Sequence, residues 1–163
     1  MTEHVELIKS DDEEYIDDFV SIKLIVIFAT YIQNKIRIMT EEEKKQLSKD
    51  EDGLRTYEYI ANHIDTCDQD LEFLLENMRR VDQSGQFLVS MARYLHAIDA
   101  AHYRDAVNRL IADAIERDRE HRYIAALLPD IWGNDYADHV DELNKTDDNF
   151  RRVYKRVFPT GLI

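Results

Sequence analysis

The stretch that decides the fold is YEYIANHIDTCDQDLEFLLENMRRV, residues 57–81. Its apolar side chains recur alternately every three and every four positions, at Tyr57, Ile60, Ile64, Cys67, Leu71, Leu74, Met78 and Val81. This spacing returns to one side of an α-helix and makes a continuous apolar seam. We therefore predict one long helix over residues 54–82 that buries this seam against other helices.

The seam has two possible kinds of partner. Ala61 and Leu75 widen it, as expected where two neighbouring helices of the same domain pack on one helix. A self-associating coiled coil needs three to four heptads, and this run just reaches that length. We favour packing within the chain and keep a structural homo-oligomer, joined through residues 57–81, as an alternative.

The N-terminal part contains the most apolar segment of the chain. Residues 15–39 are apolar nearly all round, which predicts a helix at the centre of a bundle. Their β-branched residues leave a buried strand as the alternative. The stretch Phe19–Ile32 has 14 residues and includes Lys23, whereas a membrane span needs about 20 apolar residues. We expect residues 1–14, which are polar and acidic, to be disordered.

Several shorter helices follow from capping and periodicity signals. Thr40 and Glu43 have the spacing of a capping box. Turn residues at 49–53 and 82–85 separate helical patterns, which we place at about 40–48, 54–82, 87–99, 103–115, 124–128 and 135–144. Pro129 is expected to end the helix before it and to start a loop that holds Trp132. This succession loosely resembles an α-α hairpin repeat, but a tetratricopeptide register fails at its small-residue positions and no 34-residue self-similarity is evident.

The last helix differs in charge from the rest of the chain. Residues 150–158 place Phe150, Val153 and Tyr154 on one face and basic side chains on the other. This segment is either docked by its apolar face or an arm that binds a partner. Taken together, the patterns predict an all-α fold. We expect residues 1–163 to form a single bundle of about six to seven helices around a buried N-terminal one.

Composition restricts the kind of partner. The chain has 34 acidic and 21 basic residues and a net charge of −13, so nucleic acid and anionic membranes are poor partners, because both require a positive field. A basic protein suits this charge. The single Cys67 cannot form an internal disulfide, which indicates a reducing compartment. The acidic N-terminus is the reverse of a secretory signal, so we expect the protein to be cytoplasmic.

Two acidic surfaces are the candidate binding sites. The first is a row on the outer side of the 54–82 helix, formed by Asp65, Asp68, Glu72 and Glu76. Like charges four residues apart repel, so such a row suggests a face that meets a basic partner. The second lies within residues 135–148 and contains Asp138, Asp141 and Glu142, with Trp132 or Tyr136 as possible apolar anchors. We expect a non-enzymatic interaction module of the immunity, inhibitor or adaptor type.

Catalytic signals are weak. His96 and His102 flank Asp99, which makes this cluster the best general acid/base candidate and the basis of an alternative, a helical enzyme or metal protein. The pair His63 and Cys67 has zinc-ligand spacing, but no second pair exists. No Gly-rich phosphate loop or nucleophile motif is present. We therefore predict no cofactor and no metal, and lean against an enzyme.

Overall fold

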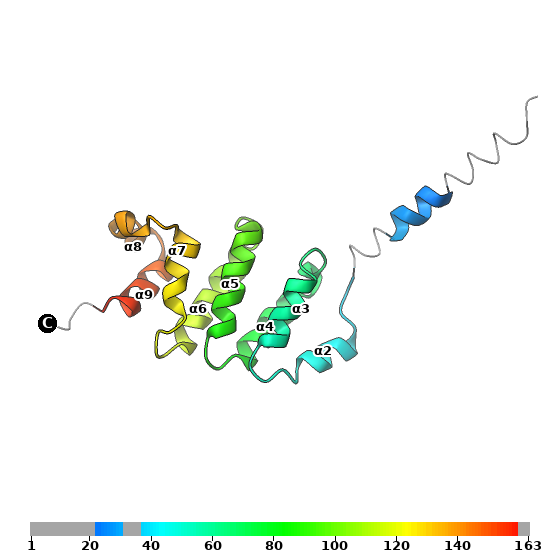
Figure 1. The fold of residues 1–163 in the computed structure, drawn as a ribbon, viewed down its shortest axis with the longest axis horizontal. Helices are drawn as coiled ribbons and strands as arrows, with labels where there is room; N and C mark the ends of the chain where they lie inside the picture. Colours follow the sequence, from blue (N-terminus) through cyan, green and yellow to red (C-terminus); the bar gives the residue numbers. More distant parts are fainter. Residues whose placement is uncertain (1–21, 31–36, 160–163) are drawn as a thin grey trace, which may run out of the picture. The chain divides into compact units, whose positions relative to one another are not determined.

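The computed structural model describes residues 22–30 and 37–159, and this part of the chain consists of helices joined by turns and loops, without a β-strand. It divides into two compact units, residues 1–37 and residues 38–163 (Figure 1). The all-α prediction is confirmed. The described residues hold nine α-helical segments, the helix at 22–30 and α2 to α9, rather than the expected six or seven.

The expected buried central helix is not confirmed. Residues 22–30 are helical, but the large apolar side chains of residues 22–28 are 57–65% exposed. None of them belongs to the buried core, which begins at Met39. The physical reason is that the other helices bury their apolar stripes against one another and so complete a core among themselves. The rest of the predicted 15–39 helix and the predicted disorder of residues 1–14 lie outside the described residues.

The predicted long helix is wrong in one respect, because it is a hairpin. The chain forms α3 (Leu54–Asn62), turns, and continues through the 3-10 helix η1 (Cys67–Asp70) into α4 (Leu71–Val81). The seam residues Ile60, Cys67, Leu74 and Met78 are all buried in one core. The i, i+3/i+4 spacing of apolar residues continues across the turn because both arms of the hairpin bury their apolar side chains in the same core. The seam residues Tyr57, Ile64 and Leu71 are partly buried against the same core, and a homo-oligomer through residues 57–81 stays a prediction.

Two further hairpins follow the first. The second pairs α5 (Gln86–Asp99) with α6 (Arg104–Arg117), close to the predicted bounds. The third runs through η2 (Ile124–Ala126), α7 (Leu127–Trp132), η3 (Tyr136–His139) and α8 (Val140–Thr146) to α9 (Asp148–Val157). At the other end, α2 (Glu41–Leu47) begins at the predicted Thr40–Glu43 capping box.

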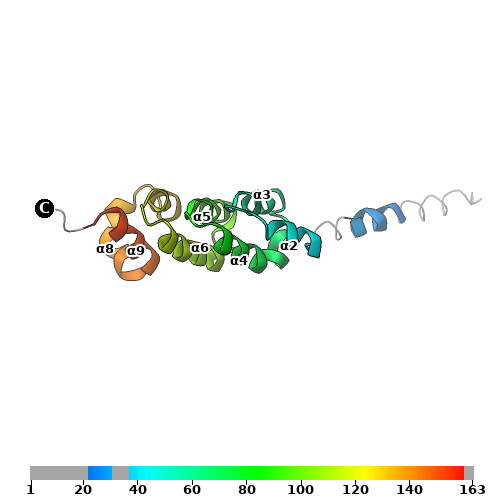
Figure 2. The same ribbon diagram turned by 90° about the horizontal axis from the view of Figure 1, so that it is seen from below.

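The helices of residues 38–159 form two layers. One layer contains α3, α5 and α7, and the other contains α4, α6 and α9, with each helix in contact with the next in its row. Figure 2 shows the two rows from below, with α2 beside α4. The arrangement is a short stack of helical hairpins. Stacks of this kind bury a continuous core between neighbouring repeats and leave one face of each row to solvent.

A buried aspartate begins each hairpin. Asp50, Asp82 and Asp118 precede α3, α5 and η2, at intervals of 32 and 36 residues. Asp82 accepts hydrogen bonds from the backbone N–H groups of Gly85, Phe87 and Leu88, at 2.8–2.9 Å. The other two accept from backbone N–H groups of their own turns in the same way. These carboxylates satisfy donors at helix starts that have no partner within the helix.

The left-handed residue of each turn also recurs. Gly53 and Gly85 have φ values of 102° and 84°, and His121 takes the equivalent place with φ 55°. Each stands three residues after its aspartate. The structure therefore contains a repeated turn. The sequence does not reveal it as a 34-residue repeat, because the left-handed position is Gly in two of the three turns and His in the third.

Two further predictions about the C-terminal part are resolved. Pro129 lies inside α7 rather than ending a helix. It stands in the first turn, where a backbone N–H has no intrahelical acceptor, so proline costs nothing there.

The basic C-terminal helix α9 is docked: Phe150 and Val153 are fully buried, and Asp147 caps it by accepting from the Phe150 N–H at 2.9 Å. Arg152 bonds Glu116 of α6 at 2.7 Å.

Candidate functional site

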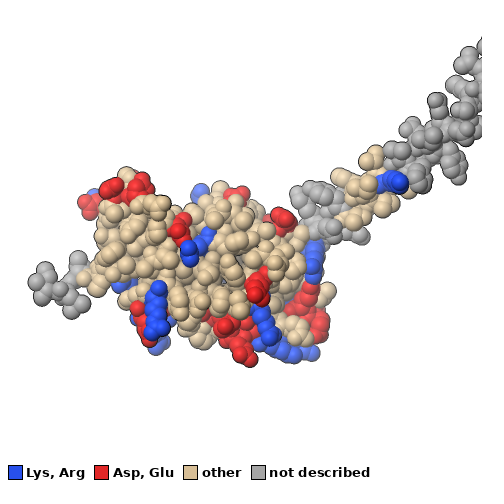
Figure 3. All heavy atoms as spheres, in the orientation of Figure 1, with Lys and Arg blue, Asp and Glu red and all other residues tan. Residues whose placement is uncertain are grey.

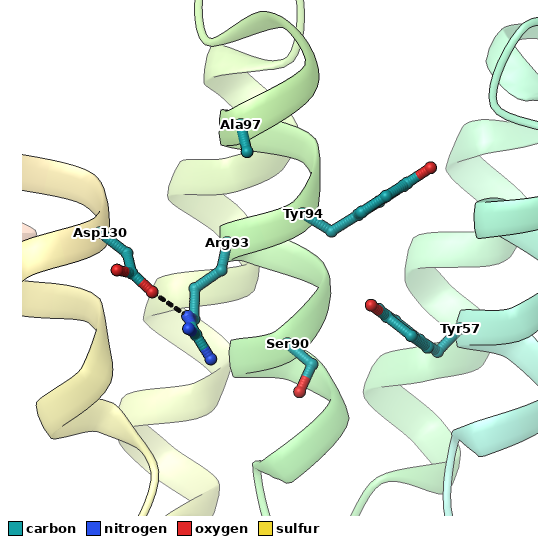
Figure 4. A pocket seen from close by; sticks show the side chains of 6 residues that line it. All are labelled: Tyr57, Ser90, Arg93, Tyr94, Ala97 and Asp130. Atoms are coloured by element: carbon teal, nitrogen blue, oxygen red, sulfur yellow. Dashed lines mark hydrogen bonds and ion pairs between the residues drawn. The ribbon is translucent and has the colours of Figure 1, made fainter.

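A groove crosses the outer face of the α3–α5–α7 layer. It has a volume of about 450 Å³ and is lined by Tyr57, Ser90, Arg93, Tyr94, Ala97 and Asp130 (Figure 4). Four of these residues lie on the solvent side of α5, one on α3 and one on α7. Ser90 and Ala97 are small, so they leave a hollow between the longer side chains of the neighbouring helices.

The α7 side of the groove holds an oriented arginine. The Nε–H of Arg93 donates to a carboxylate oxygen of Asp130, and Figure 4 shows the guanidinium between Asp130 and Ser90. Both terminal nitrogens of Arg93 are without a protein partner among the described residues. An arginine held through Nε presents the planar edge formed by its two terminal nitrogens, which matches the two oxygens of a carboxylate or phosphate.

The α3 side of the groove is aromatic. Tyr57 and Tyr94 meet edge to face, with ring centroids 6.1 Å apart, and both extend into the space between α3 and α5 (Figure 4). The Tyr94 hydroxyl donates a long hydrogen bond, 3.4 Å, to the carbonyl of Ala61. Desolvation raises the pKa of Tyr94, so this hydroxyl stays protonated at neutral pH. The groove thus joins an aromatic wall to one formed by the Arg93–Asp130 ion pair.

The predicted acidic row is not a single helix face, and three of its four acids have partners inside the protein. Asp65 lies in the turn between α3 and η1 and is exposed. Asp68 in η1 accepts from His102 and from the Tyr103 hydroxyl, at 3.0 and 3.1 Å. Glu76 pairs with Arg79 on the next turn of α4.

Glu72 is held from the neighbouring helix. It accepts two hydrogen bonds from Arg109 of α6, and this contact lowers the pKa of Glu72. Asp113 of α6 lies near Arg79, Arg109 and Arg117, yet desolvation raises its pKa. The face of α4 and α6 is therefore a mixed network of acids and arginines, in which the charge that the row would offer a partner is largely neutralised.

The second predicted acidic surface keeps its charge. Asp138, Asp141 and Glu142 on η3 and α8 are exposed, and none of their side-chain carboxylates has an ion-pair or hydrogen-bond partner among the described residues. Asp135 beside them lies 3.6 Å from His139. Figure 3 shows a group of acidic side chains over α8. This surface is the part of the predicted binding site that is most open to a partner.

The two predicted anchors are engaged inward. Trp132 ends α7, where its indole N–H donates to Asp147 at 2.8 Å and its ring meets Phe150 edge-on at 5.2 Å. Tyr136 contacts the other side of Phe150, at 6.4 Å. Both are half-buried. Their packing fixes η3 and α8 to α9, and so holds the acidic surface in place.

The weak catalytic cluster is not assembled. Asp99 accepts from the backbone N–H groups of Ala101 and His102, so it caps a turn. The His102 ring contacts Asp68 instead. His96 lines a separate cavity of about 450 Å³ with Arg104 and Trp132. The three residues thus have different contacts in the structure.

The His63 and Cys67 pair is structural as well. Cys67 is buried, and burial raises the pKa of its thiol to about 11. The His63 ring stacks on Tyr59, with ring centroids 4.2 Å apart. Among the described residues no group of three or more His, Cys, Asp or Glu side chains is placed to hold a metal ion.

Comparison with known proteins finds no matching family model, no matching curated protein and no matching solved structure. Within the described part of the chain, no helix has the length and apolar character needed to cross a membrane.

Sequence reasoning missed the groove. Arg93 and Tyr94 stand on the polar side of α5, where an isolated arginine gives no signal. Asp130 follows Pro129, which was expected to lie in a loop. The pairing needs α5 and α7 side by side, and that neighbourhood follows only from the stacking of hairpins. The one available signal was the spacing of Ser90, Arg93 and Ala97 on one side of the helix.

Proposed function

We propose that this protein is a non-enzymatic interaction module, of the immunity, inhibitor or adaptor type, that engages a basic protein partner. The observation that carries the proposal is the exposed acidic surface on η3 and α8, formed by Asp138, Asp141 and Glu142, whose carboxylates have no partner in residues 22–30 and 37–159. Fixed carboxylates accelerate and select association with a basic surface, because the potentials are complementary.

The hairpin stack supports this assignment. Repeated helical hairpins provide a rigid, extended surface that can bind another protein. The acidic surface is attached to this frame by Trp132 and Tyr136, which pack on the buried Phe150. The carboxylates are therefore presented in a fixed arrangement, and little conformational entropy is lost when a partner binds. Asp65, whose carboxylate has no partner among the residues that the structure describes, adds to the charge on another part of the surface.

A capture experiment tests the proposal. The tagged protein is used to capture partners from its native lysate at low and high salt, and bound proteins are identified by mass spectrometry. We expect a stoichiometric basic protein that is reduced at high salt, since screening weakens contacts between exposed charges.

Two variants make the experiment specific. Asp138→Asn, Asp141→Asn and Glu142→Gln together should abolish capture. The control carries the same charge change elsewhere, as Glu51→Gln, Glu58→Gln and Asp105→Asn, at exposed positions away from α8. Equal capture by both variants would contradict the proposal, because it would show that only the overall charge matters.

A further inference from the structure

The groove over α5 has a composition that the acidic surface does not explain. It combines an arginine whose terminal nitrogens are unused, two tyrosine rings and a floor of two small side chains. We propose that this groove binds the free C-terminal carboxylate of the partner polypeptide, with Arg93 as its ligand. The inference rests on the proposed function, since it names how that partner is held.

Asp130 sets the orientation of the Arg93 side chain. Asp130 accepts from the Nε–H and so fixes the plane of the guanidinium. The two terminal nitrogens then form a ready-made fork of parallel donors. A carboxylate fits such a fork with two charge-assisted hydrogen bonds, which are shorter and stronger than neutral ones. Lysine could not replace this arginine, because an ammonium group offers a point charge without the fork.

The remaining walls define what adjoins the carboxylate. Tyr57 and Tyr94 lie on the other side of the groove, and their rings offer apolar surface together with hydroxyl groups. Ser90 and Ala97 leave the space of about 450 Å³ open, which lies within the range of ordinary ligand pockets. The last side chain of a polypeptide would pack against these rings while its terminal carboxylate reaches Arg93. An apolar or aromatic last residue is the best match.

The net charge of the protein favours a chain terminus over an acid-rich segment as the ligand of the groove. The protein has a net charge of −13, so a ligand with several acidic side chains would be repelled. A C-terminus brings a single carboxylate, and the rest of the chain can be basic. Such a partner could satisfy both the acidic surface on α8 and the single cationic fork at Arg93.

Paired peptides test the inference. The probes are lysine-rich peptides that differ only in their last residue (Leu, Phe, Val or Ala), each made as the free acid and as the C-terminal amide. Binding is followed by fluorescence polarisation. We expect the free acids with Leu or Phe to bind at least about tenfold more tightly than their amides, as a charge-assisted hydrogen-bonded pair would give.

Three variants locate the binding. Arg93→Gln should remove the difference between acid and amide. Arg55→Gln on α3, an exposed arginine outside the groove, should keep it. Asp130→Asn tests the positioning role: it should reduce the difference without the loss of overall folding, which circular dichroism checks. Equal binding of acids and amides to the wild-type protein, or no binding of any peptide, would overturn the inference.

Two outcomes separate this inference from the proposed function. Amidated peptides that carry an internal Glu and bind as well as the free acids would show that the fork takes a side chain, and would overturn the terminus assignment. Peptide binding that is insensitive to Arg93→Gln but lost in the Asp138, Asp141 and Glu142 variant would leave the proposed function standing and remove the groove from it.

Discussion

Both carboxylate oxygens of Glu72 on α4 accept hydrogen bonds from Arg109 on α6, at 2.6 and 2.8 Å. This pair joins the second layer of the stack across two hairpins. It also makes the acidic row of Asp65, Asp68, Glu72 and Glu76 a weaker candidate binding site, because a carboxylate held by a bidentate arginine attracts a basic partner less strongly.

The exchange of Glu72 and Glu76 for glutamine should therefore leave partner binding almost unchanged. Both acids are exposed and paired within the protein, so their loss should lower the melting temperature only slightly. Titration of the captured partner into this double variant measures the affinity. A large loss of affinity would mean that Glu72 and Glu76 contact the partner in spite of their ion pairs within the protein.

Asp82 should be among the residues most important for stability. It is fully buried and accepts from four backbone N–H groups and from the Ser84 hydroxyl. Asp82→Ala leaves these donors unsatisfied and should cost roughly 2–4 kcal/mol in the free energy of unfolding. Denaturant unfolding measures it. Asp52→Ala is the matched control, since exposed Asp52 caps a single N–H group; similar losses in both would contradict the repeated-turn account.

The left-handed turn residues give a second stability test. Alanine at Gly85 would place its Cβ 3.1 Å from the backbone nitrogen of Asp118 at a φ of 84°, so Gly85→Ala should destabilise by about 1–2 kcal/mol or more. His121→Gly should be tolerated, because glycine adopts this conformation readily. Thermal melts of the two variants should differ clearly. Equal stability would show that the third turn is not equivalent to the first two.

Acid should remove the contribution of Asp50. Burial by itself raises the pKa of this carboxyl, but hydrogen bonds from Thr56 and Gly53 outweigh it and the net pKa is lowered. Such a group stabilises the fold above its unfolded pKa, about 3.8, and loses that contribution as pH falls through its folded value. Asp50→Asn should thus reduce the melting temperature at neutral pH, with a difference that shrinks below pH 3.8. A difference that is constant with pH would contradict this.

Cys67 should react slowly with thiol reagents in the folded protein. Its pKa of about 11 and its burial both leave little accessible thiolate at neutral pH. Labelling kinetics in the native and the urea-unfolded protein measure the effect. Comparable rates in the two states would indicate that η1 opens readily.

The predictable part of the fold follows from local patterns. The helices α5 and α6 were placed correctly because their stripes repeat without interruption, and Thr40 with Glu43 marked the start of α2. The hairpin at residues 63–66 was missed because both of its arms bury the same seam. The turn sequence His63–Thr66 contains weak helix formers, but their individual costs are below 1 kcal/mol.

The predictable part of the site is smaller. Asp138, Asp141 and Glu142 form an exposed acidic surface because acidic residues with no apolar spacing face solvent. The internal pairing of Asp68 with His102 joins residues far apart in the chain, and charge counting along one helix contains no information about it. Arg93 and Asp130 meet for the same reason, through the packing of α5 on α7.

The most direct test of the central claim is the affinity of the captured partner for three proteins, measured by isothermal titration: the wild type, the Asp138, Asp141 and Glu142 variant, and the Glu72 and Glu76 variant. We predict that the first variant loses at least about tenfold in affinity while the second keeps that of the wild type. Arginines hold Glu72 and Glu76, whereas the carboxylates of Asp138, Asp141 and Glu142 have no partner within the described part of the chain. Loss of affinity in the Glu72 and Glu76 variant alone, with the α8 variant unchanged, would contradict the account.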